Sequence, residues 1–299
     1  MTVRNRMPAL LLALVLLLAP VWPVVAAPPP ASPAPPARHV VVLSLDGARA
    51  DALRAVVPAS LVARGGASWT AQTVRPSLTL PAHASMLSGL IPAVHGVTFN
   101  DWREGGPPFR HPTVFTAVVG AGGRVAAFVN KQKLMMLVLQ GPGAYARWLA
   151  YPRFRQADVV ETAARYFVEQ RPAFLFVHVA DPDDRGHARG WMSEEYLAAI
   201  AAAPGLMERL LRAFDDAGVG AAALLIVTAD HGGHGTTHGT TRPEDMTIPW
   251  LALGGAARSG AVLGQVMVYD TAPTALVALG LPVPPDWQGR AVAEALRPR

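Results

Sequence analysis

Residues 39–47 read HVVVLSLDG, an apolar run that is β-branched at its start and ends in the pair Asp46-Gly47. Such a run is typical of a buried parallel strand that delivers an acidic side chain at its carboxyl end. Residues 125–129, 174–179 and 223–228 are similar short apolar runs, separated by stretches with helical patterning. The alternation predicts an α/β fold with a doubly wound, mostly parallel central sheet and helices on both of its faces.

The helices are expected between these strands. One is expected over residues 51–63, bent or interrupted at Pro58 and ended by the glycines that follow. A long helix is expected over residues 193–217, where Pro204-Gly205 breaks it in two, and a short one over 270–279.

The N-terminus has the order of a secretory signal peptide. Two arginines precede an apolar run over residues 9–18, and small residues then lead to a cleavage site near Ala26 or Ala27. The run is short for a membrane span, so we expect residues 1–27 to be removed and to leave no stable membrane anchor. Residues 28–38, rich in Pro and Ala, predict an extended linker, and residues 39–299 predict one catalytic domain. The protein is therefore expected to be exported, either to the periplasm or to the medium.

The composition narrows the class of protein. With 51% hydrophobic and 16% charged residues, the chain is globular rather than disordered. Its formal net charge is +5 without any Lys/Arg block, which argues against binding of a nucleic-acid polymer. There is no cysteine, so any metal must be held by nitrogen and oxygen ligands.

The densest cluster of metal-ligand residue types is residues 230–239, DHGGHGTTHG, which follow an apolar strand. Imidazole and carboxylate together form the ligand set of zinc and related metals, and the glycines let the backbone fold tightly around a small object. The alternative is a solvated loop that is merely rich in histidine.

A second cluster is residues 181–187, DPDDRGH, in which Asp183 and His187 are four apart and could share one face of a turn. Asp181 and Asp184 compete for the same role, and an ordinary surface turn is the alternative. Asp46 is the third acidic strand end. Ligands of open α/β sheets bind at the carboxyl ends of strands, so we expect the three ends to meet at a site that needs cations.

Residues 76–83, PSLTLPAH, predict the start of a helix, because Pro81 is favoured in a first turn. The Thr79 hydroxyl would then lie at a helix N-terminus, where the dipole and free amides favour an anionic phosphoryl group. The alternative is that Thr79 is only the N-cap of that helix.

In this order, the motifs resemble the alkaline phosphatase superfamily, most closely its nucleotide pyrophosphatase/phosphodiesterase branch. The resemblance runs from Val41 to about Trp250. It rests on the Asp46-Gly47 strand end, residues 79–83, Asn100, the Asp183 and His187 pair, residues 230–232, and His238-Gly239.

The resemblance implies a site with two divalent metal ions, most simply zinc. One would be held by Asp183, His187 and His238, and the other by Asp46, Asp230, His231 and the Thr79 oxygen. It also implies that Thr79 attacks phosphorus to form a phospho-threonine intermediate, while Asn100 donates to a phosphoryl oxygen. His234 is an alternative to His238 as the last ligand.

The substrate is less defined. The stretch between Asn100 and Asp183 is short, without room for large inserted elements that wrap a substrate. Lys131, with Lys133, could supply a cation for a monoester dianion, although a pair of solvated lysines is the alternative. Phe99 and Trp102 could stack on a leaving group or simply pack.

The leading functional hypothesis is a phosphodiesterase or nucleotide pyrophosphatase that acts on a small-molecule phosphate ester. A phosphomonoesterase and a phosphonate hydrolase use the same chemistry and stay open, as does a catalytically silent binding protein. A sulfatase is disfavoured because Thr79 cannot become the aldehyde of that family. A phosphoglycerate mutase is disfavoured by the export signal and the absence of the usual serine. The sequence does not predict an oligomeric state.

Overall fold

The computed structural model describes residues 1–2, 37–138 and 144–298. The signal peptide and most of the linker predicted above lie outside the described residues. Contacts along the chain divide it into Met1–Pro33 and Ala34–Arg299. Ala37 and Arg38, which the sequence predicts to lie in the linker, donate backbone hydrogen bonds to Ala278 and Ala222. The folded domain therefore includes Ala37 and Arg38. Within the described part, no helix is long and apolar enough to cross a membrane.

An eight-stranded sheet forms the centre of the described fold, in the order β4-β3-β5-β1-β6-β7-β2-β8. Its strands are β1 (His39–Leu45), β2 (Gly65–Gln72), β3 (Val125–Val129), β4 (Ala144–Trp148), β5 (Phe174–Val179), β6 (Ala223–Thr228), β7 (Thr247–Leu253) and β8 (Ala261–Val262). From β4 to β6 all neighbours are parallel, whereas β7 runs antiparallel to both β6 and β2. The prediction of a mostly parallel sheet is confirmed.

Helices follow most of the strands. They are α1 (Ala50–Val56), α2 (Ala59–Val62), α3 (Thr79–Ser88), α4 (Pro92–His95), α5 (Val114–Gly120), α6 (Met135–Val138), α7 (Gln156–Gln170), α8 (Asp181–Arg189), α9 (Glu194–Ala201), α10 (Ala203–Asp216), α11 (Pro243–Met246) and α12 (Thr271–Ala278). Pro58 separates α1 from α2, as expected. The break predicted at Pro204 lies earlier, at Ala202, because Pro204 is accommodated in the first turn of α10.

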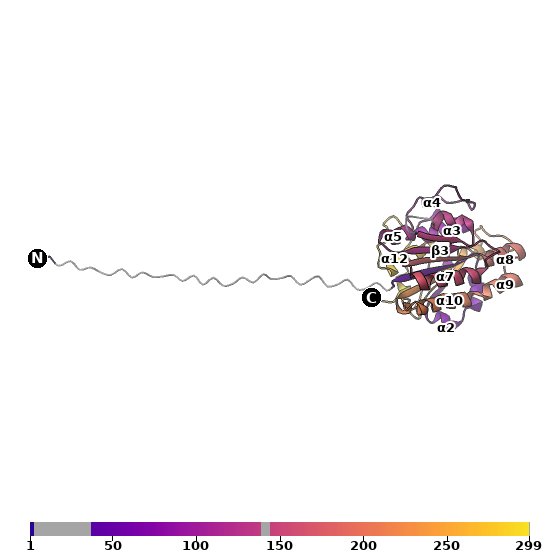
Figure 1. Ribbon diagram of the computed structural model, residues 1–299. Helices are drawn as coiled ribbons and strands as arrows, with labels where there is room; N and C mark the ends of the chain where they lie inside the picture. The colour runs from indigo at the N-terminus through magenta and orange to yellow at the C-terminus, as the bar shows by residue number, and fades with distance from the viewer. Residues whose placement is uncertain (3–36, 139–143, 299) are drawn as a thin grey trace. The chain divides into compact units, whose positions relative to one another are not determined.

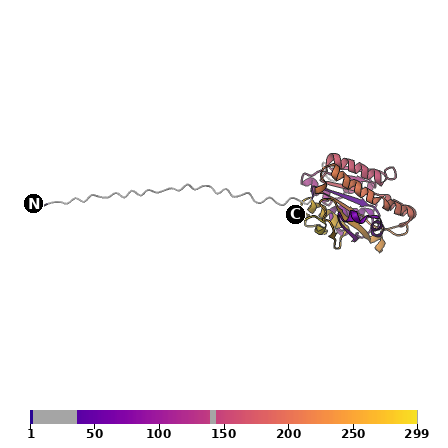
Figure 2. The ribbon, with the colours of Figure 1, turned by 90° about the horizontal axis from the view of Figure 1, so that it is seen from below.

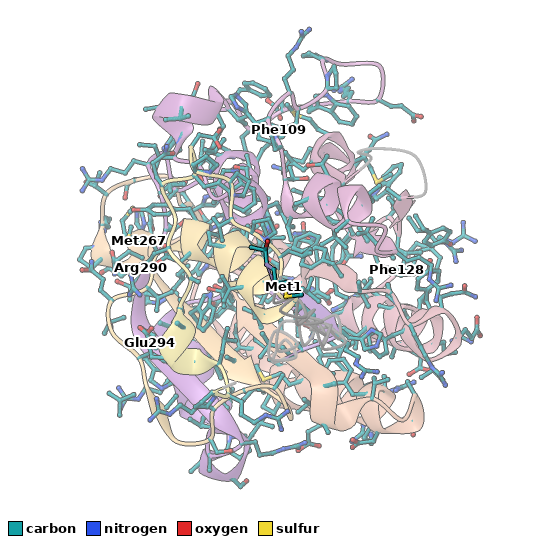
Figure 3. All side chains as sticks on the ribbon, turned by 90° about the vertical axis from the view of Figure 1, so that its left-hand side faces the viewer. Met1, Phe109, Phe128, Met267, Arg290 and Glu294 are labelled. Carbon is teal, nitrogen blue, oxygen red and sulfur yellow. The ribbon has the colours of Figure 1, made fainter. Side chains whose placement is uncertain are left out.

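The helices cover both faces of the sheet (Figures 1 and 2). On β5, Phe174 packs edge-on against Phe115 of α5 and Phe176 packs against His83 of α3, so these side chains define one face. Phe128 of β3 (Figure 3) pairs in register with Val177, which points the other way, and it packs against Tyr166 of α7. α10 packs beside α7, so helices on two sides shield the apolar sheet from water.

Candidate active site

The three acidic strand ends lie side by side. β5, β1 and β6 are consecutive neighbours, with Leu45 paired to Val179 and Ser44 paired to both His178 and Thr228. Their carboxyl ends are therefore at the same edge of the sheet, and Asp46, Asp183 and Asp230 follow from them with side chains at most 3% exposed. The predicted convergence of the strand ends is confirmed.

Each of these carboxylates binds the protein through one oxygen only. Asp46 Oδ2 accepts from His178 Nε2 and Lys131 Nζ, both at 2.8 Å, and Asp183 Oδ2 lies 2.5 Å from Lys131 Nζ. Asp230 Oδ1 accepts from the Gly47 amide at 3.1 Å. The other three oxygens, Asp46 Oδ1, Asp183 Oδ1 and Asp230 Oδ2, are buried without a hydrogen-bond partner.

Three histidines turn a nitrogen lone pair toward those free oxygens. The Nδ1 atoms of His187, His231 and His238 lie 2.9, 2.8 and 2.9 Å from the backbone carbonyls of Thr236, Gly232 and Ser77. A carbonyl can only accept, so Nδ1 carries the proton and Nε2 carries the lone pair. The Nε2 atoms then lie 3.5, 3.9 and 3.6 Å from Asp183 Oδ1. The imidazole nitrogens and the carboxylate oxygen thus face one another, and neither can donate a hydrogen bond to the other.

Two groups in this cluster have the geometry of metal ligands. Their ligand atoms lie within 4.8 Å of one another, in the sets Asp183, His231, His238 and Asp46, Asp230, His231. His231 belongs to both sets, while His187 belongs to neither and its side chain is 45% exposed. Buried acceptors without donors repel one another, so the donor set fits divalent cations.

The pKa values show the same electrostatic conflict. Burial raises the pKa of Asp46, but the charge of Lys131 and the hydrogen bond from His178 outweigh it and bring that pKa well below its usual range. Burial and then the Asp46 charge hold the pKa of Asp230 well above its usual range. Burial, followed by the neighbouring His238, lowers the pKa of His231 to about 3, so its imidazole is neutral and able to bind a metal.

Thr79 is the first residue of α3 and is buried beside this cluster. Its N-cap is Leu78, so the alternative that Thr79 is only the N-cap is wrong. Thr79 Oγ1 lies 3.5 Å from His231 Nε2. His83 fixes this turn, since its Nδ1 donates to the Thr79 carbonyl and its Nε2 accepts from Ser44 Oγ, both at 2.8 Å.

Asn100 is anchored through its oxygen. Asn100 Oδ1 accepts from the Leu80 amide at 2.9 Å and from Lys133 Nζ at 3.1 Å. Two donors on one atom fix the orientation of the side-chain amide and leave its NH₂ group to donate elsewhere. Thr79 is the first residue of α3, so its backbone N–H has no acceptor within the helix.

The two lysines are not solvated. The Lys131 side chain is 17% exposed and bridges Asp46 and Asp183, whose charges, against the effect of burial, raise its pKa. Lys133 lies on Asn100, and burial followed by the Lys131 charge lowers its pKa. Phe99 is exposed, whereas Trp102 donates to the Pro107 carbonyl at 2.9 Å within its own turn.

The sequence reasoning missed His178 and Asp245. His178 is a lone polar residue in the apolar run of β5, and that was its only signal. Buried Asp245 accepts from His234 Nδ1 at 2.7 Å and from the Thr240 amide and hydroxyl at 2.8 and 2.7 Å. His234 thus faces Asp245 and lies in neither ligand group, whereas His238 lies in one.

A mostly parallel sheet with Asp and His at three adjacent strand ends and a threonine at a helix start is the architecture of an alkaline phosphatase-type protein. Residues 40–247 match the family model of type I phosphodiesterase / nucleotide pyrophosphatase. The chain belongs to this family.

Curated relatives are longer than this chain. A 2,3-bisphosphoglycerate-independent phosphoglycerate mutase of Thermomicrobium roseum is 29% identical over 58% of this chain and 33% of its own length. Ectonucleotide pyrophosphatase/phosphodiesterase family member 1 of Rattus norvegicus is 22% identical over 64% of this chain and 24% of its own. The chain thus spans a third or less of the length of both relatives.

Solved structures share the fold. Human ectonucleotide pyrophosphatase/phosphodiesterase 5 superposes with a TM-score of 0.70 at 16% identity, over 87% of this chain and 100% of that one. A 2-O GAG sulfatase superposes with a TM-score of 0.68 at 15% identity, over 87% and 74%. At this identity the likeness shows the fold alone.

Proposed function

We propose that the protein is a two-metal hydrolase of small-molecule phosphate esters, of the phosphodiesterase/nucleotide pyrophosphatase type. One observation carries the proposal: three carboxylate oxygens without partners and three imidazole lone pairs converge at one edge of the sheet, beside Thr79. Such a set of acceptors is stable around divalent cations, for which we propose zinc.

The ligands would be shared between two ions. Asp183, His187 and His238 would hold one, and Asp46, Asp230, His231 and the Thr79 oxygen the other. The position of His231 in both geometric groups supports a pair of neighbouring ions. In each of the three histidines the hydrogen bond from Nδ1 to a carbonyl orients Nε2, as is usual for metal-binding imidazoles.

The chemistry would centre on Thr79. When bound, the metal ions lower the pKa of a coordinated hydroxyl and stabilise negative charge on oxygen. Thr79 Oγ1 gives up its proton to solvent and forms a bond to phosphorus, while the bond from phosphorus to the ester oxygen breaks. The leaving group departs as an alcohol or phosphate that takes up a proton from solvent, and a phospho-threonine forms. Water then cleaves the Thr79–phosphate bond and releases the phosphate product. The Asn100 NH₂ group and the Thr79 amide would donate to the phosphoryl oxygens throughout.

The family supports diesters and nucleotides as substrates. One fold relative, murine ectonucleotide pyrophosphatase/phosphodiesterase 5, has been solved in complex with AMP. A phosphomonoesterase is the second candidate, because Lys133 Nζ stands 3.1 Å from Asn100 Oδ1, where a cation would favour the extra charge of a monoester dianion.

We also propose export, with removal of residues 1–27. The N-terminal sequence supports this, and the curated relatives include an ectonucleotide pyrophosphatase/phosphodiesterase. Periplasmic and secreted forms are both compatible with it.

The test is kcat/KM of the full chain with added zinc on bis(p-nitrophenyl) phosphate and p-nitrophenyl phosphate. Thr79→Ala should lower both by at least ~1000-fold, since it removes the nucleophile, while Thr79→Ser keeps a hydroxyl and most of the activity. A strong diester preference supports the proposal. A monoester preference that Lys133→Ala abolishes supports the second candidate. An unaffected Thr79→Ala variant would refute both.

A further inference from the structure

His178 is a fully buried histidine that the proposed chemistry does not use. It lies on β5, on the same face as Phe174 and Phe176, one residue before the strand end. Its Nδ1 lies 3.3 Å from the backbone amide of Asn130. Because an amide can only donate, Nδ1 accepts and the proton is on Nε2, which donates to Asp46 Oδ2 at 2.8 Å. This is the opposite tautomer from that of the three histidines in the cluster.

Lys131 donates to the same oxygen of Asp46 as His178 does. It follows Asn130 directly, and its Nζ lies 2.8 Å from Asp46 Oδ2. Asn130 is itself fixed, since its Nδ2 donates to the carbonyls of Leu149 and Phe154 at 2.7 and 3.1 Å, and its Oδ1 accepts from the Ala180 amide at 3.1 Å. The end of β3 thus holds both donors in place.

The result is an asymmetric carboxylate. Asp46 Oδ2 has two donors and Oδ1 has none, and Oδ1 points to His231 Nε2 at 3.5 Å. Asp183 receives Lys131 but not His178, and Asp230 is held by the Gly47 amide. His178 therefore contacts one of the three carboxylates and no other.

We propose that Asn130 and His178 together fix the orientation of the Asp46 carboxylate, so that only its Oδ1 is offered to a metal ion. His178 is then a positioning residue for one metal site. The inference rests on the proposed function only in requiring that the site binds divalent metal. A purely structural histidine in the core would contribute to stability and leave metal affinity unchanged.

The test is a calorimetric zinc titration of the metal-depleted full chain. His178→Leu removes the donor to Asp46 and should weaken one of the two zinc sites by about 10–100-fold, with the other changed by less than about threefold. His178→Gln should stay within about threefold of wild type, because its terminal amide can donate from the position of Nε2. His178→Asn reaches only the position of Nδ1, so it should behave like His178→Leu without placing an apolar group beside Asn130.

His95→Leu is the matched control. His95 is also buried and bonded, to Ser85 Oγ at 3.0 Å, but it lies outside the cluster and should lower the melting temperature without changing zinc affinity. Equal weakening of both sites, a His178→Gln variant as weak as His178→Leu, or a wild type that binds no zinc overturns the proposal. If His178→Leu weakens only one zinc site, the orienting role of His178 is supported. If the zinc-loaded wild type in addition hydrolyses no phosphate ester, the proposed function is refuted and the orienting role is not.

Discussion

The proposed metal ligands come from two segments that follow the strands on either side of β1, namely α8 after β5 and residues 230–240, the glycine loop, after β6. The two segments hold these residues in different ways. In α8, Asp183 and His187 are one helical turn apart, so backbone hydrogen bonds fix their relative placement. The glycine loop contains Asp230, His231 and His238, but it forms no helix or strand. Its only regular feature among the described residues is the pair of backbone hydrogen bonds between His234 and Thr237.

The glycine loop depends on partners from elsewhere in the chain. The Gly232 and Gly233 amides donate to the carbonyls of Asp245 and Glu244 at 2.9 Å, and the Asp245 side chain holds Thr240. Gly232 also needs to be glycine, because a Cβ there would overlap the Glu244 carbonyl. The placement of side chains on α8 is therefore fixed by local hydrogen bonds, whereas that of the loop depends on tertiary contacts.

The largest expected effect separates the two histidines that approach Asp183. His238 belongs to the loop and its side chain is 6% exposed, whereas His187 on α8 is 45% exposed. Water can replace His187 at an open position more easily than it can replace a buried ligand. Loss of a residue that merely hydrogen-bonds to a metal ligand typically lowers metal affinity by about 10–100-fold. We therefore expect His238→Ala to weaken zinc binding by more than ~100-fold and the exposed His187→Ala by about tenfold. Zinc titration measures both, and His95→Leu, outside the cluster, is the control. Equal losses for His187 and His238 would remove the distinction.

The next effect concerns the tethers of the two segments. Asp245→Ala frees His234 and Thr240, so the loop loses its anchor, and kcat/KM with zinc should fall by about 10–100-fold. On the helical side, Arg155 Nε donates to Asp181 Oδ1 at 2.6 Å, but the arginine is 44% exposed. Arg155→Ala should lower kcat/KM by less than about threefold, because the helix keeps its own hydrogen bonds and the buried Asp181 carboxylate keeps the Gln156 amide as a donor at 2.9 Å. If Arg155→Ala is as damaging as Asp245→Ala, α8 is not self-supporting.

The same contrast explains how much of the site could be predicted. Asp183 and His187 were proposed from a local signal, their spacing of four residues, and both do lie on one helix, α8. The choice between His234 and His238 was open because it depends on Asp245, which is bound to His234 only in the folded chain. His178 was missed because its partners, Asn130 and Asp46, are far from it in sequence.

The fold follows a similar rule. The strands β1, β3, β5 and β6 were predicted with their observed bounds because they are buried on both faces and read as continuous apolar runs. β2, β4, β7 and β8 were missed. GGASWTAQ and AYARW are partly exposed and lack such a run, and β8 has only two residues. β7 is buried, but its run TIPWLAL contains Pro249, which is unusual inside a central strand. The glycines taken as a helix end instead begin β2, where a Cβ on Gly65 would overlap the Ala252 carbonyl of β7.

A smaller effect is expected where the two segments meet. The Trp191 indole lies against both Gly186 of α8 and Gly233 of the loop, so that a Cβ on Gly186 would come within 2.6 Å of the ring. Gly186→Ala should lower the free energy of unfolding by about 1–2 kcal/mol, because overpacking of about 1–3 kcal/mol exceeds the gain in helix propensity. Urea unfolding measures it. Gly205→Ala in α10, with nothing near the added Cβ, should be neutral or stabilising, and a similar result for Gly186→Ala would mean that the indole moves freely.

The smallest expected effect is the pH dependence of zinc affinity, which again separates the segments. Burial raises the pKa of Asp183, but the Lys131 charge outweighs it and leaves the pKa below its usual range. This carboxylate therefore stays ionised at the pH values at which Asp230 takes up a proton. Burial and the Asp46 charge raise the pKa of Asp230, so in the metal-free chain it holds a proton at pH values above the ordinary aspartate range. Zinc needs the carboxylate; affinity is therefore complete above the raised pKa of Asp230 and falls as the pH drops through it. We expect a loss of up to about tenfold per pH unit in that range, with release of about one proton, from titrations in buffers of different ionisation enthalpy. No proton release would mean that Asp230 is already ionised in the metal-free chain, and that the loop is as well prepared for metal as the helix.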